Sequence, residues 1–593
     1  MGAADGELLI KFVPEMSDIL DQTLTRAGGI STRSGIPSTD EVLNILGAYH
    51  FERVFPVDPK TEKRTREAGM HLWYIVRFDK DTDLKEAARQ LRKLGEISKI
   101  QSNPTIRRAY DPKKKPLYLS ASDLQHVTRT SEGLTFNDPG LKHQWHYQNT
   151  GSYDFVKEGA EAIAGADVNC GEAWKLCKGD PTIIVAVLDE GVMWNHPDLI
   201  GNMWTNEAEE IGSTEDKDGN GYKGDRYGYN FVKNTGVISW TSAEDTGHGT
   251  HVAGTIAAVN GNNKGVGGIA GGDGTENSGV KIMTCQLFDG AYGCTLAAEA
   301  KAIKYAADNG AVILQCSWGY NSPDANEALG YTPGPKDEQD WENQYPLEKE
   351  ALDYFIHNAG SPNGVIDGGL AIFASGNEYA PSSSYPAGYS KCISVSAIAA
   401  DFTPSSYTNY GEEITLCAPG GDGDYYGTPG VADDEFAWEG KTQGLILSTA
   451  IKNGQPAYAY MEGTSMACPH VSGVAALGLS HAVKERRHFK VAEFIELMKE
   501  TANDQFYNFY DEKVEKLYYY NHTTFGAPPT LMNLIERKGK MGRLVDAGAL
   551  LKAIGNHGSD MIVPNVYLAT GKSTSIDLAR YFIDGESLNY SCT

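Results

Sequence analysis

The 593-residue chain lacks any apolar run of eighteen or more residues, so we expect no transmembrane helix. It also lacks CxxC pairs, and its nine cysteines show no pattern of a small disulfide-rich domain. The first residues, Met1 to Asp5, have neither the basic nor the apolar region of a signal peptide. Cysteine usage therefore does not decide the cellular compartment, and either a leader has been removed or the protein is cytosolic.

Positive charge is scarce as well. The chain has 52 Lys and Arg against 78 Asp and Glu, a net charge of −26, which argues against nucleic acid or an anionic membrane surface as partners. The deficit is uneven, because Met1–Pro116 carries 20 basic and 17 acidic residues while the remainder carries 32 and 61. This asymmetry favours electrostatic docking of the first segment on the rest. Two independently solvated faces are the alternative.

Most cysteines lie in apolar or small-residue surroundings, where a thiol behaves as a small core side chain. Cys170 and Cys177 flank a short helical pattern, and we expect them to form a pair. The odd total then predicts at least one free thiol or an intermolecular bond. The cysteines expected to be buried are Cys285, Cys316, Cys392, Cys417 and Cys468.

The segment GTSMACPHVSG, Gly463–Gly473, carries the strongest chemical signal. A small-residue turn delivers the hydroxyl of Ser465, and the apolar run Val471–Leu479 predicts a buried helix behind it. Ser465 should therefore lie at a helix N-terminus, where unpaired N–H groups and the positive end of the helix dipole stabilise an oxyanion. Taken alone, the segment is equally consistent with a tightly packed turn before a helix.

Two upstream segments supply the groups that such a serine needs. TIIVAVLDEGV, Thr182–Val192, predicts a buried strand that ends at Asp189, and GHGTHVAGTIAAV, Gly247–Val259, predicts a close-packed helix with His248 in its first turn. A nucleophilic serine needs a base, and a histidine base needs a carboxylate that fixes its tautomer. Separately, Asp189 is more typical of a turn residue and His248 of a structural histidine.

The three motifs, in the order Asp, His, Ser, resemble those of the subtilase family of serine peptidases. The resemblance implies that Asp189 orients the imidazole, His248 is the general base and Ser465 is the nucleophile. FASGNE, Phe373–Glu378, matches a fourth family motif and implies that the Asn377 amide and the Ser465 N–H form the oxyanion hole. Without the other motifs, Asn377 would be interpreted as a turn residue.

Apolar runs alternate with helical patterns through the centre of the chain, which predicts an α/β fold. With the resemblance, we expect a subtilisin-like parallel sheet covered by helices on both faces. Ser317, Trp318 and Gly319 match one wall of the family's S1 pocket, and Ser375 and Gly376 are further substrate-binding candidates. We expect insertions at 321–367 and 421–460 to rim the cleft. The predicted strands are Ile183–Leu188, Val280–Phe288, Ala311–Cys316, Leu370–Ala374 and Cys392–Ala397.

The first 110 residues alternate strand and helix patterns and predict a small α+β, ferredoxin-like unit. This unit resembles the inhibitory propeptide of subtilases, which implies a self-cleavage bond at Tyr110–Asp111. Lys113–Lys115 offer a second site, which an external trypsin-like enzyme could cut. An unrelated binding module is the alternative. The expected domains are 1–110 (propeptide), 111–137 (linker), 138–556 (catalytic) and 557–593, the start of a β-sandwich-like module that is cut short.

DKDGNGYKGD, Asp216–Asp225, places oxygen ligands at alternate positions around a glycine turn. It predicts a structural Ca²⁺ bound by Asp216, Asp218, Asn220 and Asp225. The bidentate glutamate of an EF-hand loop is missing, since Tyr227 stands at that position, so a plain Asx-rich turn is the alternative. The predicted chemistry needs no catalytic cofactor.

We therefore expect a serine endopeptidase that is secreted, periplasmic or attached to the cell surface. Its partners would be protein or peptide substrates and its own propeptide, which holds it as a zymogen. Two alternatives are a catalytically silent scaffold that only binds, and a narrowly specific processing enzyme. Asp189 is followed by Glu190 where subtilisins usually carry Ser or Thr, so subtilisin-like preferences do not transfer. The sequence leaves P1 specificity and oligomeric state open.

Overall fold

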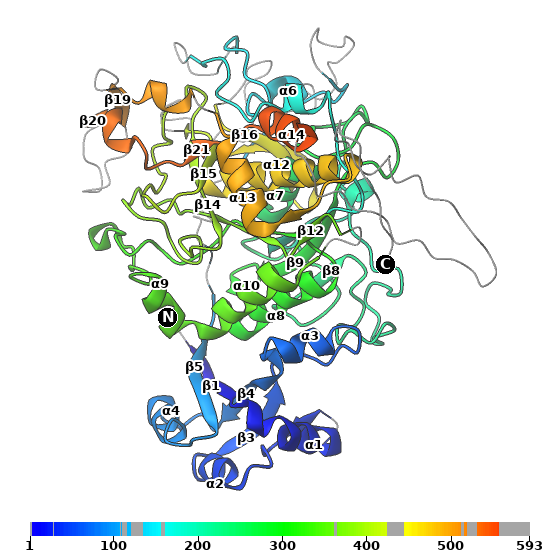
Figure 1. Cartoon of the computed structure of the whole chain (residues 1–593), viewed down its shortest axis with the longest axis vertical. Coiled ribbons are helices and arrows are strands. Elements are labelled where there is room, and N and C mark those ends of the chain that lie inside the picture. The colour runs from blue at the N-terminus through cyan, green and yellow to red at the C-terminus, as the bar shows by residue number, and fades with distance from the viewer. Residues whose placement is uncertain are drawn as a thin grey trace, which may run out of the picture.

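The computed structural model describes most of the chain (Figure 1). The predicted cleavage bond Tyr110–Asp111, the lysines 113–115, most of the linker 111–137 and the predicted module 557–593 lie outside the described residues. No helix in the described part of the chain is both long and apolar enough to span a membrane. The described residues are 3–27, 29–106, 108, 116–119, 135–153, 155, 161–360, 364–423, 444–503, 505–511, 515–518 and 530–556.

Residues 3–106, here called the N-terminal domain, form an antiparallel sheet in the order β2-β3-β4-β1-β5. Leu8, Ile10 and Phe12 of β1 pack under the helices, whereas Leu9 faces the rest of the molecule. Without β2, α2 and α3, the elements follow one another as β1, α1, β3, β4, α4 and β5, which is the βαββαβ topology of the predicted ferredoxin-like fold. The strands are β1 (Ala3–Phe12), β2 (Ile30–Ser31), β3 (Ala48–Arg53), β4 (Trp73–Phe78) and β5 (Ile97–Pro104). The helices are α1 (Ser17–Ala27), α2 (Pro37–Ile45), α3 (Glu62–Glu67) and α4 (Leu84–Leu91).

The rest of the described chain, here called the main body, is built on a nine-stranded sheet in the order β10-β9-β7-β11-β13-β14-β15-β21, with β8 paired to β9. Its strand pairs are parallel except that of β10 with β9, among the described residues. The predicted α/β class is therefore confirmed. The strands are β7 (Ile184–Glu190), β8 (Gly228–Asn230), β9 (Lys281–Asp289), β10 (Tyr292–Gly293), β11 (Ile313–Cys316), β13 (Leu370–Ala374), β14 (Ile393–Ile398), β15 (Leu416–Pro419) and β21 (Arg543–Leu544).

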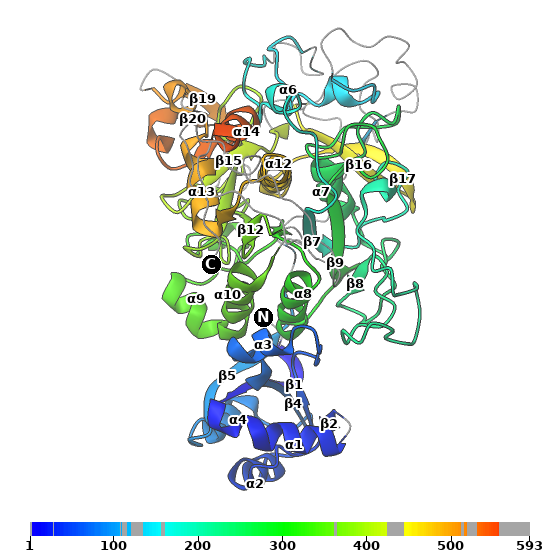
Figure 2. The ribbon, with the colours of Figure 1, turned by 45° about the vertical axis from the view of Figure 1, so that its right-hand side comes forward.

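Helices cover both faces of this sheet, and β7 shows why (Figure 2). Val185 and Val187 pack on the side of α7 and α12, while Ala186 and Leu188 pack on the side of α8 and α10. Strands that are buried on both faces read as continuous apolar runs, as predicted. The helices are α6 (Cys170–Ala173), α7 (His248–Ala257), α8 (Leu296–Asp308), α9 (Glu338–Gln344), α10 (Pro346–Asn358), α12 (Thr464–Lys484), α13 (Val491–Glu500) and α14 (Ala547–Asn556).

Three smaller sheets complete the main body. Strands β16 (Ile446–Lys452) and β17 (Gln455–Met461) form a hairpin whose edge pairs with β6 (Leu117–Tyr118). The other two are the pairs β12 (Ile366–Asp367) with β18 (Phe489–Lys490) and β19 (Glu515–Tyr518) with β20 (Thr530–Asn533). Short 3-10 helices occupy Pro14–Met16, Met70–Leu72, Leu141–His143, Ile200–Asn202, Glu327–Leu329, Phe506–Phe509 and Leu534–Arg537.

Two sequence-based expectations are wrong. The segment 321–367 does not simply rim the cleft, because α10 within it packs against α8 and its Leu352 and Phe355 are buried under the sheet. Cys170 and Cys177 do not pair; both are free, and the Cys177 thiol turns toward the carbonyl of Gly179 at 3.9 Å. Cys170 is buried in the core instead.

Candidate active site

The carboxyl ends of the parallel strands bring the predicted site residues to one edge of the sheet. Asp189 is the last residue but one of β7. This strand pairs with β9 and β11 and is buried along its whole length. Its side chain is 1% exposed, and Oδ1 accepts a hydrogen bond from the Glu190 N–H at 2.7 Å. Crevices beyond the carboxyl ends of such strands are where open α/β sheets bind ligands.

His248 is the first residue of α7 and faces Asp189 directly. Its Nδ1 lies 2.8 Å from Oδ1 and 2.9 Å from Oδ2 of Asp189, and both side chains are 1% exposed. A carboxylate at this distance favours the proton on Nδ1, which makes Nε2 the acceptor. Gly249 permits the approach of helix to strand, because a Cβ there would lie 2.3 Å from the Glu190 carbonyl oxygen.

Ser465 is the second residue of α12, as the small-residue turn predicts. Gly463 precedes the helix at φ 149°, a conformation that favours glycine, and its carbonyl accepts the N–H of Met466 at 2.9 Å. The Ser465 hydroxyl donates to the Ser317 carbonyl at 3.3 Å, and the residue is 2% exposed. Helix α12 packs beside α7 in the same core, so the serine and the histidine come from adjacent helix N-termini.

Asn377 follows β13 and points at the same helix end. Its Oδ1 accepts hydrogen bonds from the Thr464 N–H at 2.9 Å and the Thr464 hydroxyl at 2.8 Å. Because the oxygen is bound on this side, the NH₂ group of the amide is directed away from Thr464. Gly376 holds φ 108°, and a Cβ there would lie 2.3 Å from Asn409 Nδ2, which explains the glycine before Asn377.

The predicted substrate-binding residues follow β11 and β13, which are neighbours in the sheet. Trp318 is 2% exposed and packs edge-on against Phe373, with ring centroids 5.5 Å apart, so its indole is enclosed in the core. A Cβ at Gly319 would lie 2.9 Å from the Tyr385 carbonyl oxygen. Ser375 is buried, and its carbonyl accepts the N–H of Ser384.

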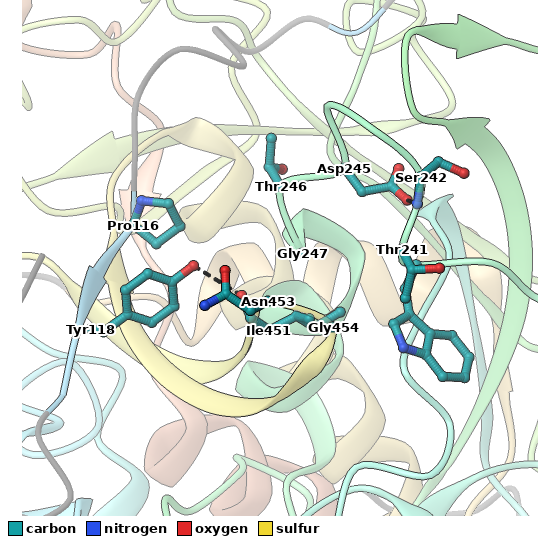
Figure 3. Close-up of a pocket in the computed structure, with 11 residues that line it drawn as sticks. Pro116, Tyr118, Thr241, Ser242, Asp245, Thr246, Gly247, Ile451, Asn453 and Gly454 are labelled. Carbon is teal, nitrogen blue, oxygen red and sulfur yellow. Dashed lines mark hydrogen bonds between the residues drawn. The ribbon is translucent and has the colours of Figure 1, made fainter.

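A pocket of about 490 Å³ adjoins the start of α7 (Figure 3). Its walls come from the loop before α7, from the turn of the β16–β17 hairpin and from the segment that contains β6. Tyr118 closes one side and donates its hydroxyl proton to the Ile451 carbonyl at 2.9 Å. The lining residues include Pro116, Tyr118, Trp240, Asp245, Gly247 and Asn453.

The model of the subtilase family matches residues 180–520, which contain every one of these side chains from Asp189 to Ser465. The chain belongs to the subtilase family.

Curated relatives agree with this assignment. A halolysin-like extracellular serine protease of Natrialba magadii is 30% identical over 320 residues, 54% of this chain and 44% of that protein. A calcium-dependent protease of Nostoc sp. is 30% identical over 352 residues, 57% of this chain and 43% of that protein. This subtilase thus spans about half the length of the curated relatives it matches.

The solved structures show the same fold. The crystal structure of fervidolysin from Fervidobacterium pennivorans, described as a keratinolytic enzyme related to subtilisin, superposes with a TM-score of 0.51 at 20% identity. The match covers 93% of this chain and 61% of fervidolysin. At this identity the likeness concerns the fold alone, and it confirms the predicted subtilisin-like architecture.

The acidic loop of this subtilase does not gather all four predicted calcium ligands. Carboxylate oxygens of Asp216 and Asp218 lie within 4.8 Å of each other and of Glu209, a residue that the alternating pattern does not reveal. Asn220 and Asp225 instead bond to each other at 3.0 Å, and Asp225 also accepts the Tyr305 hydroxyl. Glu209 lies seven residues before the motif, so only folding brings it there.

Burial and the neighbouring carboxylate at Asp216 both raise the pKa of Asp218, although Asn206, the Asn220 N–H and Lys60 oppose the rise. Glu209 Oε2 accepts the Gly224 N–H at 3.0 Å. Three partly buried carboxylates that share one loop suit a hard divalent cation such as Ca²⁺, which takes oxygen ligands in flexible geometry. The donor set therefore fits calcium.

Proposed function

We propose that this subtilase is a serine endopeptidase in which Asp189, His248 and Ser465 are the catalytic residues. The observation that carries the proposal is the buried contact of 2.8 Å between His248 Nδ1 and Asp189 Oδ1, together with a serine at the N-terminus of α12, the helix that packs against α7. A carboxylate that orients an imidazole, and an imidazole that activates a hydroxyl, are the parts of acyl transfer.

In the proposed mechanism, Ser465 Oγ attacks a peptide carbonyl while His248 Nε2 takes the hydroxyl proton. Asp189 stabilises the imidazolium that results and is not itself protonated. The tetrahedral oxyanion is bound by the Asn377 amide and the Ser465 N–H, each positioned before the reaction. His248 then protonates the leaving amine, and water hydrolyses the acyl-enzyme by the reverse sequence of proton transfers.

We further propose that residues 1–110 are the inhibitory domain of a zymogen. The N-terminal domain lies against α8 and α10 (Figure 2). The backbone N–H of Ala297, in the first turn of α8, donates to Asn103 Oδ1 at 3.0 Å, and that of Leu347, in the first turn of α10, donates to Gln101 Oε1 at 2.8 Å. The sheet thus supplies hydrogen-bond acceptors to two helix N-termini, whose first N–H groups have no partner within the helix.

Charge complementarity supports the same docking. Glu350 of α10 is bound by Lys11 at 2.8 Å, Trp73 Nε1 at 2.8 Å and Lys99 at 3.0 Å. Burial opposes ionisation of Glu350, but the charge of Lys11 and these hydrogen bonds outweigh it and lower its pKa. Among the described residues, every ion pair between the N-terminal domain and the main body has its base in the N-terminal domain and its acid in the main body. The charge asymmetry of the sequence predicts this arrangement.

We propose the Tyr110–Asp111 bond as the self-cleavage site. Residues on both sides of it are attached to the main body: the Ile106 N–H donates to the Cys294 carbonyl at 2.9 Å, and β6 pairs with β17. The uncleaved chain is therefore anchored before and after the bond. We propose 111–137 as linker and 138–556 as catalytic domain.

Two further proposals concern conditions outside the cleft. We propose secretion, since a relative is described as extracellular, and protein or peptide substrates. We also propose that Glu209, Asp216 and Asp218 hold a structural Ca²⁺, supported by relatives described as calcium-dependent proteases. The ion would rigidify a surface loop and take no part in the chemistry.

Labelling with a fluorophosphonate probe tests the central proposal. The full chain is treated with the probe before and after limited proteolysis, beside the variants Ser465→Ala and Ser480→Ala. Ser480 lies on the same helix and donates its hydroxyl to the Ala476 carbonyl, so it is the matched control. We expect labelling of wild type and Ser480→Ala after proteolysis and none of Ser465→Ala. Equal labelling of Ser465→Ala by the probe contradicts the proposal. A wild-type protein that is neither labelled nor able to hydrolyse peptides also contradicts it and favours a non-catalytic binding scaffold.

A further inference from the structure

The chain that leaves the N-terminal domain runs in extended form beside β10, at the edge of the nine-stranded sheet, toward Glu190. Thr105 bridges Thr295 in antiparallel fashion, and the Ile106 N–H donates to the Cys294 carbonyl at 2.9 Å. Ile106 is 4% exposed and joins the core beneath the sheet. The fit is close, since a Cβ at Gly293 would lie 2.1 Å from the Ile106 carbonyl oxygen. The tail thus adds its backbone to an edge of the main body as a bound peptide does.

Two residues further on, the Arg108 guanidinium is enclosed by four acceptors. It lies 3.1 Å from Glu190 Oε1 and 3.7 Å from Asp245 Oδ1, and it donates to the carbonyls of Glu244, at 2.9 Å, and of Gly290. The Arg108 side chain is 10% exposed, that of Glu190 2% and that of Asp245 4%. An enclosed guanidinium held by carboxylates forms charge-assisted hydrogen bonds, the strong kind.

The two carboxylates are positioned by the main body itself. Glu190 accepts the backbone N–H of Thr246 and of His248, both at 3.1 Å for Oε2. Asp245 accepts the N–H of Ser242 through Oδ2 and that of Gly290 through Oδ1, each at 2.7 Å. These bonds do not involve Arg108, so the arrangement of acceptors does not depend on the tail.

The two carboxylates are buried on the same guanidinium, and a cation between them offsets their mutual repulsion. Burial raises the pKa of Asp245 to about 6, and the neighbouring Glu190 carboxylate adds to the rise. Two buried like charges repel each other where there is little water, and a guanidinium between them offsets that repulsion. Glu190 is also covalently next to Asp189, whose carboxylate bonds to His248. The cation therefore sits beside the candidate catalytic pair.

We propose that Glu190 and Asp245, with the carbonyls of Glu244 and Gly290, form a specificity subsite for an arginine side chain of the substrate, which Arg108 fills in the uncleaved chain. The subsite rests on the proposed peptidase function. It receives the third residue before the cleaved bond if Tyr110–Asp111 is the bond cut, and the second if the cut follows Ala109. The substrate class is peptides with arginine at that one position.

A purely structural role of Glu190, as acceptor for the N-terminus of α7, is the alternative. It is separable, because Gln in its place keeps an oxygen acceptor for Thr246 and His248 and removes only the charge. Asp245→Asn removes the second charge in the same way. Glu276→Gln is the matched control, because it removes an exposed charge that lies outside the subsite.

The experiment uses the full chain after activation by limited proteolysis. A peptide series carries one arginine at each of the four positions before the cleaved bond, and a parallel series carries citrulline, its neutral isostere. The readout is the ratio of kcat/KM for arginine over citrulline at each position. We expect a ratio of ~10–100 at one position, the second or third, in wild type and in Glu276→Gln. In Glu190→Gln and Asp245→Asn the ratio falls about tenfold.

The ratio cancels any general loss of activity, and the wild-type series alone is decisive if a variant does not fold. Hydrolysis with ratios near one at every position overturns the subsite and leaves the peptidase proposal standing. A preference that persists unchanged in both Glu190→Gln and Asp245→Asn also overturns it. Failure of wild type to hydrolyse any peptide or to react with the fluorophosphonate overturns both proposals.

Discussion

Ser317 and Ser465 exchange two hydrogen bonds. The Ser317 hydroxyl donates to the Ser465 carbonyl at 2.8 Å, and the Ser465 hydroxyl donates to the Ser317 carbonyl at 3.3 Å. The first bond compensates for a defect in α12, because Pro469 stands four residues after Ser465 and has no N–H to donate to that carbonyl. A strand end thereby holds the serine at its helix N-terminus.

This relationship predicts energetic coupling between Ser317 and Pro469. Ser317→Ala should lower the free energy of unfolding by ~1–3 kcal/mol, because a buried carbonyl loses its donor. In the double variant with Pro469→Ala, the new N–H at position 469 can bond to the Ser465 carbonyl and recover part of that loss. Denaturant unfolding of the four proteins of this cycle gives the coupling energy. Purely additive effects would show that the two donors do not share an acceptor.

Asn377→Leu should lower kcat by ~10²–10³ with little change in KM, because the amide bonds chiefly to the oxyanion of the transition state. Thr464→Val removes one of the two donors that orient Asn377 Oδ1, so a smaller loss of kcat is expected. Steady-state kinetics on a peptide substrate measure both. A large rise in KM at constant kcat would instead make Asn377 a ground-state binding residue.

Glu350→Ala should weaken inhibition by the separate N-terminal domain. Residues 1–110 are expressed alone, which the domain's own core under β1 and β4 permits, and added to the activated main body. Loss of the acceptor for Lys11, Trp73 and Lys99 should raise the inhibition constant ~10–100-fold. Glu342→Ala is the control, since Glu342 pairs with Lys349 inside the main body. Equal constants for the two variants would contradict docking through Glu350.

Calcium removal should lower the melting temperature, because an ion that binds only the native state stabilises it by mass action. EDTA should lower the melting temperature of wild type and of the control Asp273→Asn, whose carboxylate belongs to a separate exposed turn. It should lower the melting temperatures of Glu209→Gln and Asp218→Asn much less. Calorimetric titration with Ca²⁺ checks binding directly. Identical melting curves with and without EDTA in wild type would remove the ion from this loop.

A buried carboxyl pair predicts a pH dependence of stability. Burial raises the pKa of Glu348 to about 7, and burial together with the Glu348 charge raises the pKa of Glu299 well above its ordinary value. In the unfolded chain these groups lose their protons near pH ~4.3. The folded state therefore binds more protons from about pH 4.5 upward. Unfolding free energy should fall as the pH rises from 5 through 7.

Glu299→Gln should remove one proton from this linkage and flatten the slope by about 1.4 kcal/mol per pH unit. Exposed Glu327→Gln is the control and should keep the wild-type slope. Denaturant unfolding at pH 5, 6 and 7 measures it. An unchanged slope in Glu299→Gln would show that the pair does not hold the extra proton.

Local patterns in the sequence were enough to predict the secondary-structure elements and the class of fold. Apolar runs such as the one that ends at Asp189 predicted strands buried on both faces, and β7 is buried throughout. The turn at Gly463 predicted a helix N-terminus at Ser465, and α12 begins at Thr464. These features depend on residues a few positions apart, where backbone preferences and hydrophobic period act directly.

Which distant groups meet depends instead on how the elements pack in three dimensions. Glu209 joins Asp216 and Asp218, and Arg108 reaches Glu190 across 82 positions of sequence, although no local pattern marks either contact. The expected pairing of Cys170 with Cys177 failed for the same reason, since direction of a side chain depends on the packing around it. Sequence period fixes which face a residue occupies, whereas the close packing of strands, helices and tail fixes what stands opposite.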